Sequence, residues 1–134
     1  MKYRFLNHTA DIKFQVYGKD LNEIFENAVE AVAEYISRGQ KIKTSKGKVI
    51  EVFGNDLESL FYKFLDELVY LLDAEDFIAA KAEVTIRGYN LKAELFGDNA
   101  SNYKDFDAIK AATYAEMYIK KTPKGFEAKA VLDV

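Results

Sequence analysis

From Phe77 to the C-terminus the hydrophobic pattern has a period of two, and this long run most constrains the fold. Apolar residues alternate with polar ones through four segments, separated by turn sequences such as 122-TPKG-125. Alternation of this kind is typical of strands that bury one face. The second half of the chain is therefore predicted to be an antiparallel run of four strands. These strands are residues 77–86, 91–95, 109–120 and 126–134.

Two amphipathic helices are predicted in the first half of the chain. Asp20 is followed by Glu23 at the capping-box spacing, and Asn55 or Asp56 begins the second helical stripe. Apolar residues recur at helical spacing in both segments, as expected for helices that bury one face. Before residue 77, the predicted strands are 3–6, 11–17 and 48–53, and the predicted helices are 21–36 and 57–72.

This order predicts an α+β fold, with a mostly antiparallel (mixed) β-sheet and two amphipathic helices packed on one of its faces. At 134 residues the chain is expected to form a single domain that spans residues 1–134. The absence of cysteine excludes disulfides, cysteine-type zinc sites and thiol catalysis. The sequence has no apolar run long enough for a membrane span, so a cytoplasmic protein without membrane contact is expected.

Basic residues gather in one segment, 38-RGQKIKTSKGK-48, although the net charge of the chain is −3. One interpretation is a solvated connection between two elements. The alternative is a contact with RNA phosphates or with an acidic partner, although the segment contains no aromatic residue that could stack on a base. The basic residues are Arg38, Lys41, Lys43, Lys46 and Lys48.

The single histidine of the chain lies in 8-HTAD-11, directly before an alternating strand. Thr9 and Asp11 can accept hydrogen bonds from nearby backbone N–H groups, so one interpretation is a turn that begins the strand. The functional alternative is that Asp11 is a metal-binding or acid–base carboxylate with His8 beside it. A His/Cys zinc site cannot be assembled from one histidine, and no glycine-rich phosphate loop precedes either helix.

The C-terminus, 132-LDV-134, places the Asp133 side chain close to the terminal carboxylate of Val134. Two such anions repel each other unless a cation or a basic group lies between them. Ca²⁺ and Mg²⁺ bind oxygen ligands of this kind, whereas the alternative is a frayed end with two hydrated anions. Lys110, near the start of strand 109–120, could lie beside such carboxylates as a counter-charge or a phosphate ligand, or be an ordinary surface lysine.

Four short motifs, in order along the chain, resemble the archease family. They are 8-HTAD-11, 109-IKAATY-114, 125-GF-126 and 133-DV-134, and the similarity extends through the two-helix middle. The resemblance implies an archease-like fold and an accessory role in RNA processing. Archease-like proteins activate the tRNA-splicing RNA ligase by promoting its guanylylation and its multiple turnover in tRNA exon joining. The ligase is thus the expected protein partner, with indirect contact to tRNA or nucleotide, and no intrinsic catalysis is expected.

The resemblance also implies the residues of the site. Ligase activation is expected to depend on Asp11, Lys110 and Asp133. A divalent cation, Ca²⁺ in first place and Mg²⁺ or Mn²⁺ otherwise, would be bound by Asp11, Asp133 and Val134. These residues supply fewer oxygens than the roughly six to eight that Ca²⁺ takes. Water or groups of the partner would complete the coordination of the cation. The supporting positions are His8, Thr9 and Tyr114.

Three features depart from the family pattern. Ala115 stands where a histidine often follows the Thr-Tyr pair, and Lys13 stands where a small residue is common. The acidic loop before the Ile-Lys strand lacks the histidine that many members carry there, and offers only Asp98, Asp105 and Asp107. These positions bear on the choice and the affinity of the metal.

Two other function classes are open from the residues alone. A metal-dependent phosphate-ester hydrolase or phosphotransfer enzyme could be built on Asp11, Asp133 and His8. A chaperone-like protein-binding module is the second. Phosphate-ester turnover by the isolated protein would favour the enzyme, and metal-independent binding of many unfolded clients would favour the module.

Overall fold

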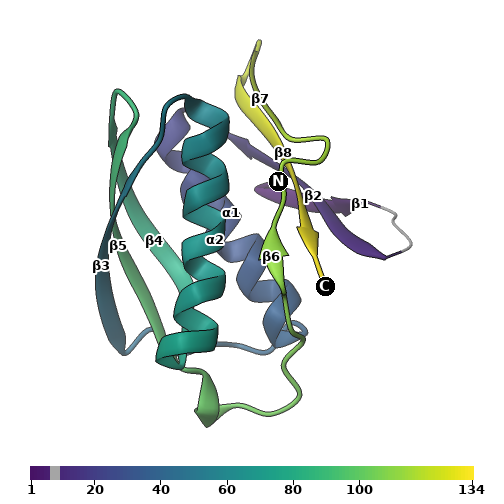
Figure 1. The fold of residues 1–134 in the computed structure, drawn as a ribbon, viewed down its shortest axis with the longest axis vertical. Helices are drawn as coiled ribbons and strands as arrows, with labels where there is room; N and C mark the ends of the chain where they lie inside the picture. The colour runs from purple at the N-terminus through teal and green to yellow at the C-terminus, as the bar shows by residue number, and fades with distance from the viewer. Residues whose placement is uncertain (7–9) are drawn as a thin grey trace.

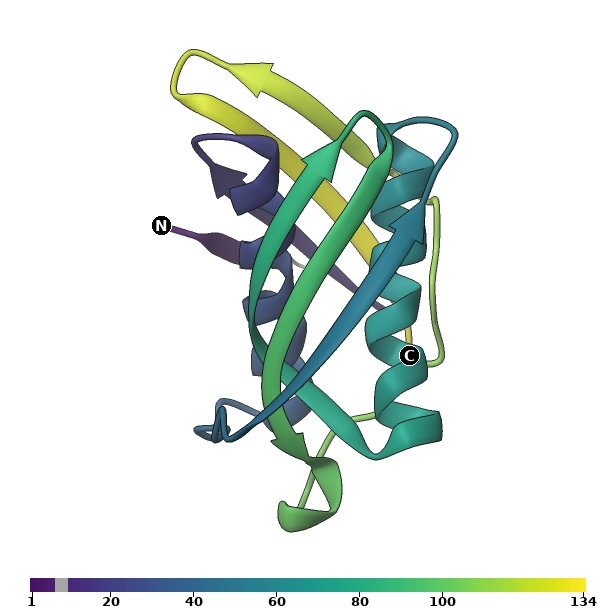
Figure 2. The same ribbon diagram turned by 90° about the vertical axis from the view of Figure 1, so that its left-hand side faces the viewer.

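The computed structural model describes residues 1–6 and 10–134, which form an α+β fold of two helices and eight strands. The strands form two separate sheets, and both helices lie between them (Figures 1 and 2). The elements are β1 (Tyr3–Leu6), β2 (Asp11–Gly18), α1 (Leu21–Ser37), β3 (Lys46–Phe53), α2 (Leu57–Glu75), β4 (Phe77–Arg87), β5 (Asn90–Asn99), a short 3-10 turn (Ala100–Asn102), β6 (Ala111–Ala112), β7 (Tyr118–Thr122) and β8 (Gly125–Asp133).

The strands pair in a way that corrects one part of the predicted architecture. Sheet A has the order β1-β2-β8-β6, with β7 also paired to β8, and sheet B has the order β3-β5-β4. All of these pairs are antiparallel, which confirms the α+β class. The prediction of a single sheet is wrong, because the strands divide into two. Alternation shows which face a strand buries but carries no information about its pairing partner, and β3 pairs with β5 rather than joining sheet A.

The helix starts agree with the predicted caps. The Asp20 carboxylate accepts a hydrogen bond from the backbone N–H of Glu23 at 2.9 Å. Asp56, rather than Asn55, is the N-cap of α2, and its carboxylate accepts from the backbone N–H of Ser59 at 2.7 Å. Both helices begin where a side chain satisfies a free backbone N–H group.

Helix α1 lies along the free edge of β4, the outer strand of sheet B. The backbone N–H of Ile86 donates to the Asn22 side-chain oxygen at 3.1 Å, and that of Val84 donates to the Glu26 carboxylate at 2.9 Å. An uncovered edge would leave these N–H groups available for pairing with another chain. Side chains of α1 therefore take the role of a missing neighbouring strand.

A register shift in β4 changes the predicted alternation. It falls between Ala79 and Lys81, and the adjacent residues Phe77 and Ile78 are both buried. Across the ladder, a Cβ at Gly97 would overlap the carbonyl oxygen of Ile78. Glycine at this position allows the two backbones to approach closely at the irregularity.

The segment predicted as one long strand, 109–120, is broken into β6 and β7. Both pieces pair with β8, through Ala112 opposite Leu132 and Tyr118 opposite Lys129. Six positions separate the first residues of these two pairs, whereas their partners on β8 are only three positions apart. The surplus residues form a turn, closed by a 3.2 Å hydrogen bond from the Met117 N–H to the Tyr114 carbonyl. Regular alternation continues through the surplus residues in the sequence, which is why it predicted an unbroken strand.

Aromatic side chains of both helices meet in the core. Phe25 of α1 packs edge to face against Phe61 and Phe64 of α2, with ring centroids 5.1 and 5.3 Å apart. Phe14 and Leu132 of sheet A, also fully buried, belong to the same apolar cluster. Within the described residues, neither helix combines the length and the apolar character that crossing a membrane requires.

Candidate functional site

Asp11, Lys110 and Asp133 meet at one end of sheet A. Asp11 begins β2 and lies directly opposite Asp133, the last residue of β8. On the other side of β8, Asp133 lies opposite Ala111, and the Lys110 backbone N–H donates to the Asp133 carbonyl at 2.8 Å. Three segments from distant parts of the sequence are thus joined at the position where the chain ends (Figure 1).

The two carboxylates lie on the face of sheet A that points away from the core. Ile12, Phe14 and Val16 of β2 are buried, so Asp11 projects to the opposite face. Residues directly opposite in an antiparallel pair share one face, which puts the Asp133 side chain beside that of Asp11. Asp133 is exposed and Asp11 is half-buried, so the pair is open to a partner.

The chemistry of the donor set fits a hard cation. Among residues 1–6 and 10–134, no side-chain donor forms a hydrogen bond with either carboxylate, and no lysine or arginine nitrogen lies within 4.0 Å of them. Uncompensated oxygen anions side by side are the ligands that Ca²⁺ and Mg²⁺ bind. The same described residues contain no cluster of three or more His, Cys, Asp or Glu side chains arranged for a metal. A cation here would therefore depend on two side chains and on oxygens of the chain end at Val134.

His8 and Thr9, the supporting positions before β2, lie outside the described residues. Tyr114, the third supporting position, lies in the turn between β6 and β7 and not in a strand. Its ring stacks on Tyr62 of α2, with centroids 4.2 Å apart and planes 7° apart, while about half of its surface (54%) is exposed. Desolvation raises the pKa of Tyr114.

Helix α2 also contacts the strand next to the site. The Asp66 carboxylate is 3.5 Å from the backbone N–H of Ala112 in β6, a long hydrogen bond. Asp66 is therefore more than a solvated surface acid, because β6 lies against the helix at this point. This contact helps to place Lys110, two residues before Ala112.

A second charged group, which was not predicted from the sequence, joins the two strands that carry the acids. Glu116, in the turn between β6 and β7, accepts from the Lys13 ammonium at 2.6 Å and from the Lys129 ammonium at 2.8 Å. The hydrogen bond from Lys129 has the largest effect on the pKa of Glu116, and the one from Lys13 has the next largest. Together they lower this pKa to about 2. The sequence carried no signal for this contact, because the prediction of a continuous strand left no turn to fold back over β2 and β8.

The basic segment after α1 is largely paired within the chain. Arg38 forms an ion pair with Asp107 at 2.8 Å, and Lys48 forms one with Glu75 at 2.5 Å. Lys46 contacts the side-chain oxygen of Asn99. These contacts favour the interpretation of the segment as a connection between elements, and an RNA contact through its other lysines stays a prediction.

Asp98, which was predicted to lie in the acidic loop before β6, is part of β5 and is held by hydrogen bonds from residues that follow it. Asp98 is almost fully buried and accepts from the backbone N–H of Asn99 and from the Tyr103 hydroxyl, each at 2.8 Å. The Tyr103 hydrogen bond is the largest of the effects that lower the pKa of Asp98. This carboxylate therefore has a structural role in the loop.

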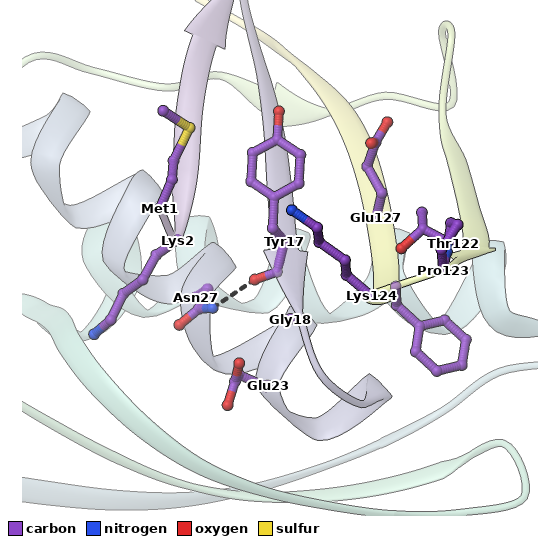
Figure 3. A pocket seen from close by; sticks show the side chains of 11 residues that line it. Met1, Lys2, Tyr17, Gly18, Glu23, Asn27, Thr122, Pro123, Lys124 and Glu127 are labelled. Carbon is purple, nitrogen blue, oxygen red and sulfur yellow. Dashed lines mark hydrogen bonds between the residues drawn. The ribbon is translucent and has the colours of Figure 1, made fainter.

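An open groove of about 720 Å³ lies at the other end of sheet A, far along β2 and β8 from Asp11 and Asp133. Figure 3 shows Tyr17, Lys124 and Glu127 among its lining side chains. Its acids already have partners: Glu127 accepts from the Tyr118 hydroxyl at 2.5 Å, and Glu23 accepts from the Lys19 backbone N–H at 3.2 Å. The groove mixes charges of both signs and does not point to one class of ligand.

Known proteins similar to this chain cover its whole length. The family model described as the archease protein family (MTH1598/TM1083) matches residues 3–134. The "Protein archease" of Archaeoglobus fulgidus is 38% identical over 137 residues, which cover 100% of both chains. That of Methanosarcina barkeri is 36% identical over 140 residues, covering 99% of this chain and 96% of the relative. The solution structure of Methanobacterium thermoautotrophicum protein 1598 superposes with a TM-score of 0.81 at 27% identity, over 99% of each chain. The chain belongs to the archease family.

Proposed function

We propose that this protein is an accessory activator of the tRNA-splicing RNA ligase. It promotes guanylylation of the ligase and its multiple turnover in tRNA exon joining, and it has no catalytic activity of its own. Membership in the archease family supports this role. Contact with tRNA or nucleotide is indirect, through the ligase to which the protein binds.

The observation that carries the proposal is the pairing of Asp11 with Asp133 beside Lys110. Eight residue pairs join β2 to β8, so the two carboxylates are held on a regular ladder rather than on mobile loops. The Lys110 N–H anchors the incoming segment to the Asp133 carbonyl, which brings the cationic side chain of Lys110 to the same end of the sheet. A partner surface would meet two anions and one cation in a fixed order.

We infer that Asp11, Asp133 and the terminal residue Val134 hold a divalent cation, with Ca²⁺ in first place and Mg²⁺ or Mn²⁺ as alternatives. When bound, the cation would supply a positive charge that can attract phosphate oxygens. The two aspartates orient it and leave part of its coordination open to the ligase or to water. Lys110 offsets the remaining negative charge of the two carboxylates.

A guanylylation assay of the cognate ligase tests the proposal, with this protein limiting and Ca²⁺, Mg²⁺ and Mn²⁺ varied. Wild type should increase both the rate of guanylylation and the number of ligation turnovers. Asp11→Ala, Asp133→Ala and Lys110→Ala should lose most of this increase. Asp73→Ala, an exposed acid of α2, is the matched control and should stimulate like wild type.

Other results of the same experiments would replace the proposal. Stimulation by Asp11→Ala and Asp133→Ala at the wild-type rate would exclude the acid pair from the function. Hydrolysis of a phosphate ester by the isolated protein, lost in Asp11→Ala, would make it an enzyme. Metal-independent binding of many unfolded proteins, unchanged in these variants, would make it a chaperone-like module.

A further inference from the structure

Glu116 joins the turn between β6 and β7 to two strands of sheet A through one carboxylate. Its two oxygens accept from Lys13 of β2 at 2.6 Å and from Lys129 of β8 at 2.8 Å. The two lysine side chains are largely covered, with 25% and 18% of their surface exposed. Glu116 itself has a positive φ of 54°, a conformation uncommon for a residue with a side chain. The turn thus holds this carboxylate over the two ammonium groups.

Lys13 of β2 lies next to the acid pair, which is Asp11 and Asp133. It follows Asp11 by two positions and projects to the same face of sheet A. Residues spaced in this way along a strand are about 7 Å apart, and Asp133 is the diagonal neighbour of Lys13 across the ladder. A lysine has a flexible four-carbon stem and a compact charge, so both carboxylates are within its range.

The Lys13 ammonium is paired with Glu116 and not with those carboxylates. It lies 2.6 Å from Glu116, whereas no ion pair joins it to Asp11 or Asp133 among the described residues. Without the charge of Glu116, Lys13 and Lys129 would lose their shared counter-ion. Asp11 and Asp133, which are acids on the same face of the sheet, would then be open to pairing with Lys13.

We propose that Glu116 holds the Lys13 ammonium away from Asp11 and Asp133, and that this ion pair sets the affinity of the acid pair for a divalent cation. The inference rests on the cation site of the proposed function. Lys13 is a competitor within the chain for the oxygens that the cation needs. Glu116 keeps those oxygens free by binding the competitor.

The turn is also held by hydrogen bonds that do not involve Glu116, so the charge of Glu116 can be removed without loss of the turn. The backbone N–H and the hydroxyl of Thr113 both donate to the Val131 carbonyl, at 3.2 and 2.8 Å. The Ala115 N–H donates in turn to the Thr113 hydroxyl at 3.2 Å. Glu116→Gln, which keeps the size of the side chain, should therefore remove the charge and leave the turn in place.

Isothermal titration of the full chain with Ca²⁺ tests the proposal, using wild type, Glu116→Gln, Lys13→Gln and the double variant. Glu116→Gln should bind Ca²⁺ about three- to fivefold more weakly, the range expected for a partly exposed charge pair. Lys13→Gln should bind more tightly than wild type, a result that partial unfolding cannot produce. In the Lys13→Gln background, Glu116→Gln should have little effect. Glu83→Gln, an exposed acid of β4 in sheet B, controls for the change in net charge.

Three outcomes separate the possible failures. If wild type does not bind Ca²⁺, Mg²⁺ or Mn²⁺, the cation site of the proposed function is wrong. If wild type binds and Glu116→Gln binds equally well, the role given to Glu116 is wrong while the site stands. If Glu116→Gln weakens binding by the same factor with and without Lys13, the effect is a general loss of negative charge, and competition by Lys13 is excluded.

Discussion

Asp11 and Asp133 lie directly opposite each other in sheet A, although they come from the two ends of the chain. They stand at one end of the ladder of eight residue pairs that joins β2 to β8. This pairing means that a group bound between the two carboxylates would link the beginning and the end of the polypeptide. Such a link would stabilise the folded protein and not the unfolded chain, because the two acids are far apart once the ladder opens.

Ca²⁺ should therefore raise the melting temperature of wild type, and the acid pair should be required for the rise. At a free concentration of 100 Kd, a cation that binds only the folded state adds about 2.7 kcal/mol. Asp11→Asn and Asp133→Asn should lose the rise. Without Ca²⁺, they should melt no lower than wild type, because each substitution removes a repulsion between anions. Scanning calorimetry with and without Ca²⁺ checks both expectations. An equal rise in the melting temperature of all three proteins would show that the cation binds at another site.

Glu116 should give the protein an acid-sensitive contribution to stability. Its folded-state pKa of about 2 is below its ordinary value of 4.5. The ionised carboxylate therefore favours the folded state above about pH 4.5, and this contribution is lost as the pH falls from 4.5 through 2. The difference in unfolding free energy between wild type and Glu116→Gln, measured by urea unfolding from pH 7 to pH 2, should be constant at neutral pH and shrink across that window. A difference that does not change with pH would contradict the prediction, and Glu83→Gln provides the comparison for a remote acid.

Local signals in the sequence were sufficient for the cap of α1 and for the turn 122–125, and they narrowed the cap of α2 to Asn55 or Asp56. Asp20 and Asp56 act through backbone groups three residues away, so a short window of sequence contains both partners. The turn 122–125 is equally local, and β7 and β8 pair directly across it. Asp11 and Asp133 were brought together by the resemblance to the archease family, because no local signal links two residues so far apart in the sequence.

The remaining features depend on strand partners, which alternation does not encode. The division into two sheets follows from β3 pairing with β5, and nothing in the pattern of 48–53 distinguishes that partner from β2. The break between β6 and β7 depends on how many residues span two fixed pairs on β8. Glu116 could not be recognised as a ligand of Lys13 and Lys129 until that break was known.

The contact between α1 and the edge of β4 should be essential for the order of that strand. Asn22→Ala would leave the Ile86 N–H without its partner, at a cost of about 1–3 kcal/mol for a buried unsatisfied donor and less if water replaces it. We expect faster amide hydrogen exchange at Ile86 and only a modest change at positions far from α1. Exchange measured by NMR, with Asp73→Ala as a control on the exposed side of α2, checks this. Uniformly faster exchange through sheet B would show global destabilisation instead of loss of an edge cover.

The stack of Tyr62 and Tyr114 should contribute a measurable coupling between α2 and the turn that carries Glu116. Parallel aromatic pairs add about 0.5–1.5 kcal/mol beyond their buried area, and the lower part of that range is expected because Tyr114 is half exposed. A double-mutant cycle of Tyr62→Ala and Tyr114→Ala, followed by urea unfolding, measures this energy. Tyr70 is an exposed tyrosine on the same helix without a stacked partner among the described residues, so a cycle of Tyr70→Ala with Tyr114→Ala should give a coupling near zero. Equal couplings in the two cycles would mean that the stack does not hold the turn, and the Thr113 hydrogen bonds to Val131 would then be its main anchor.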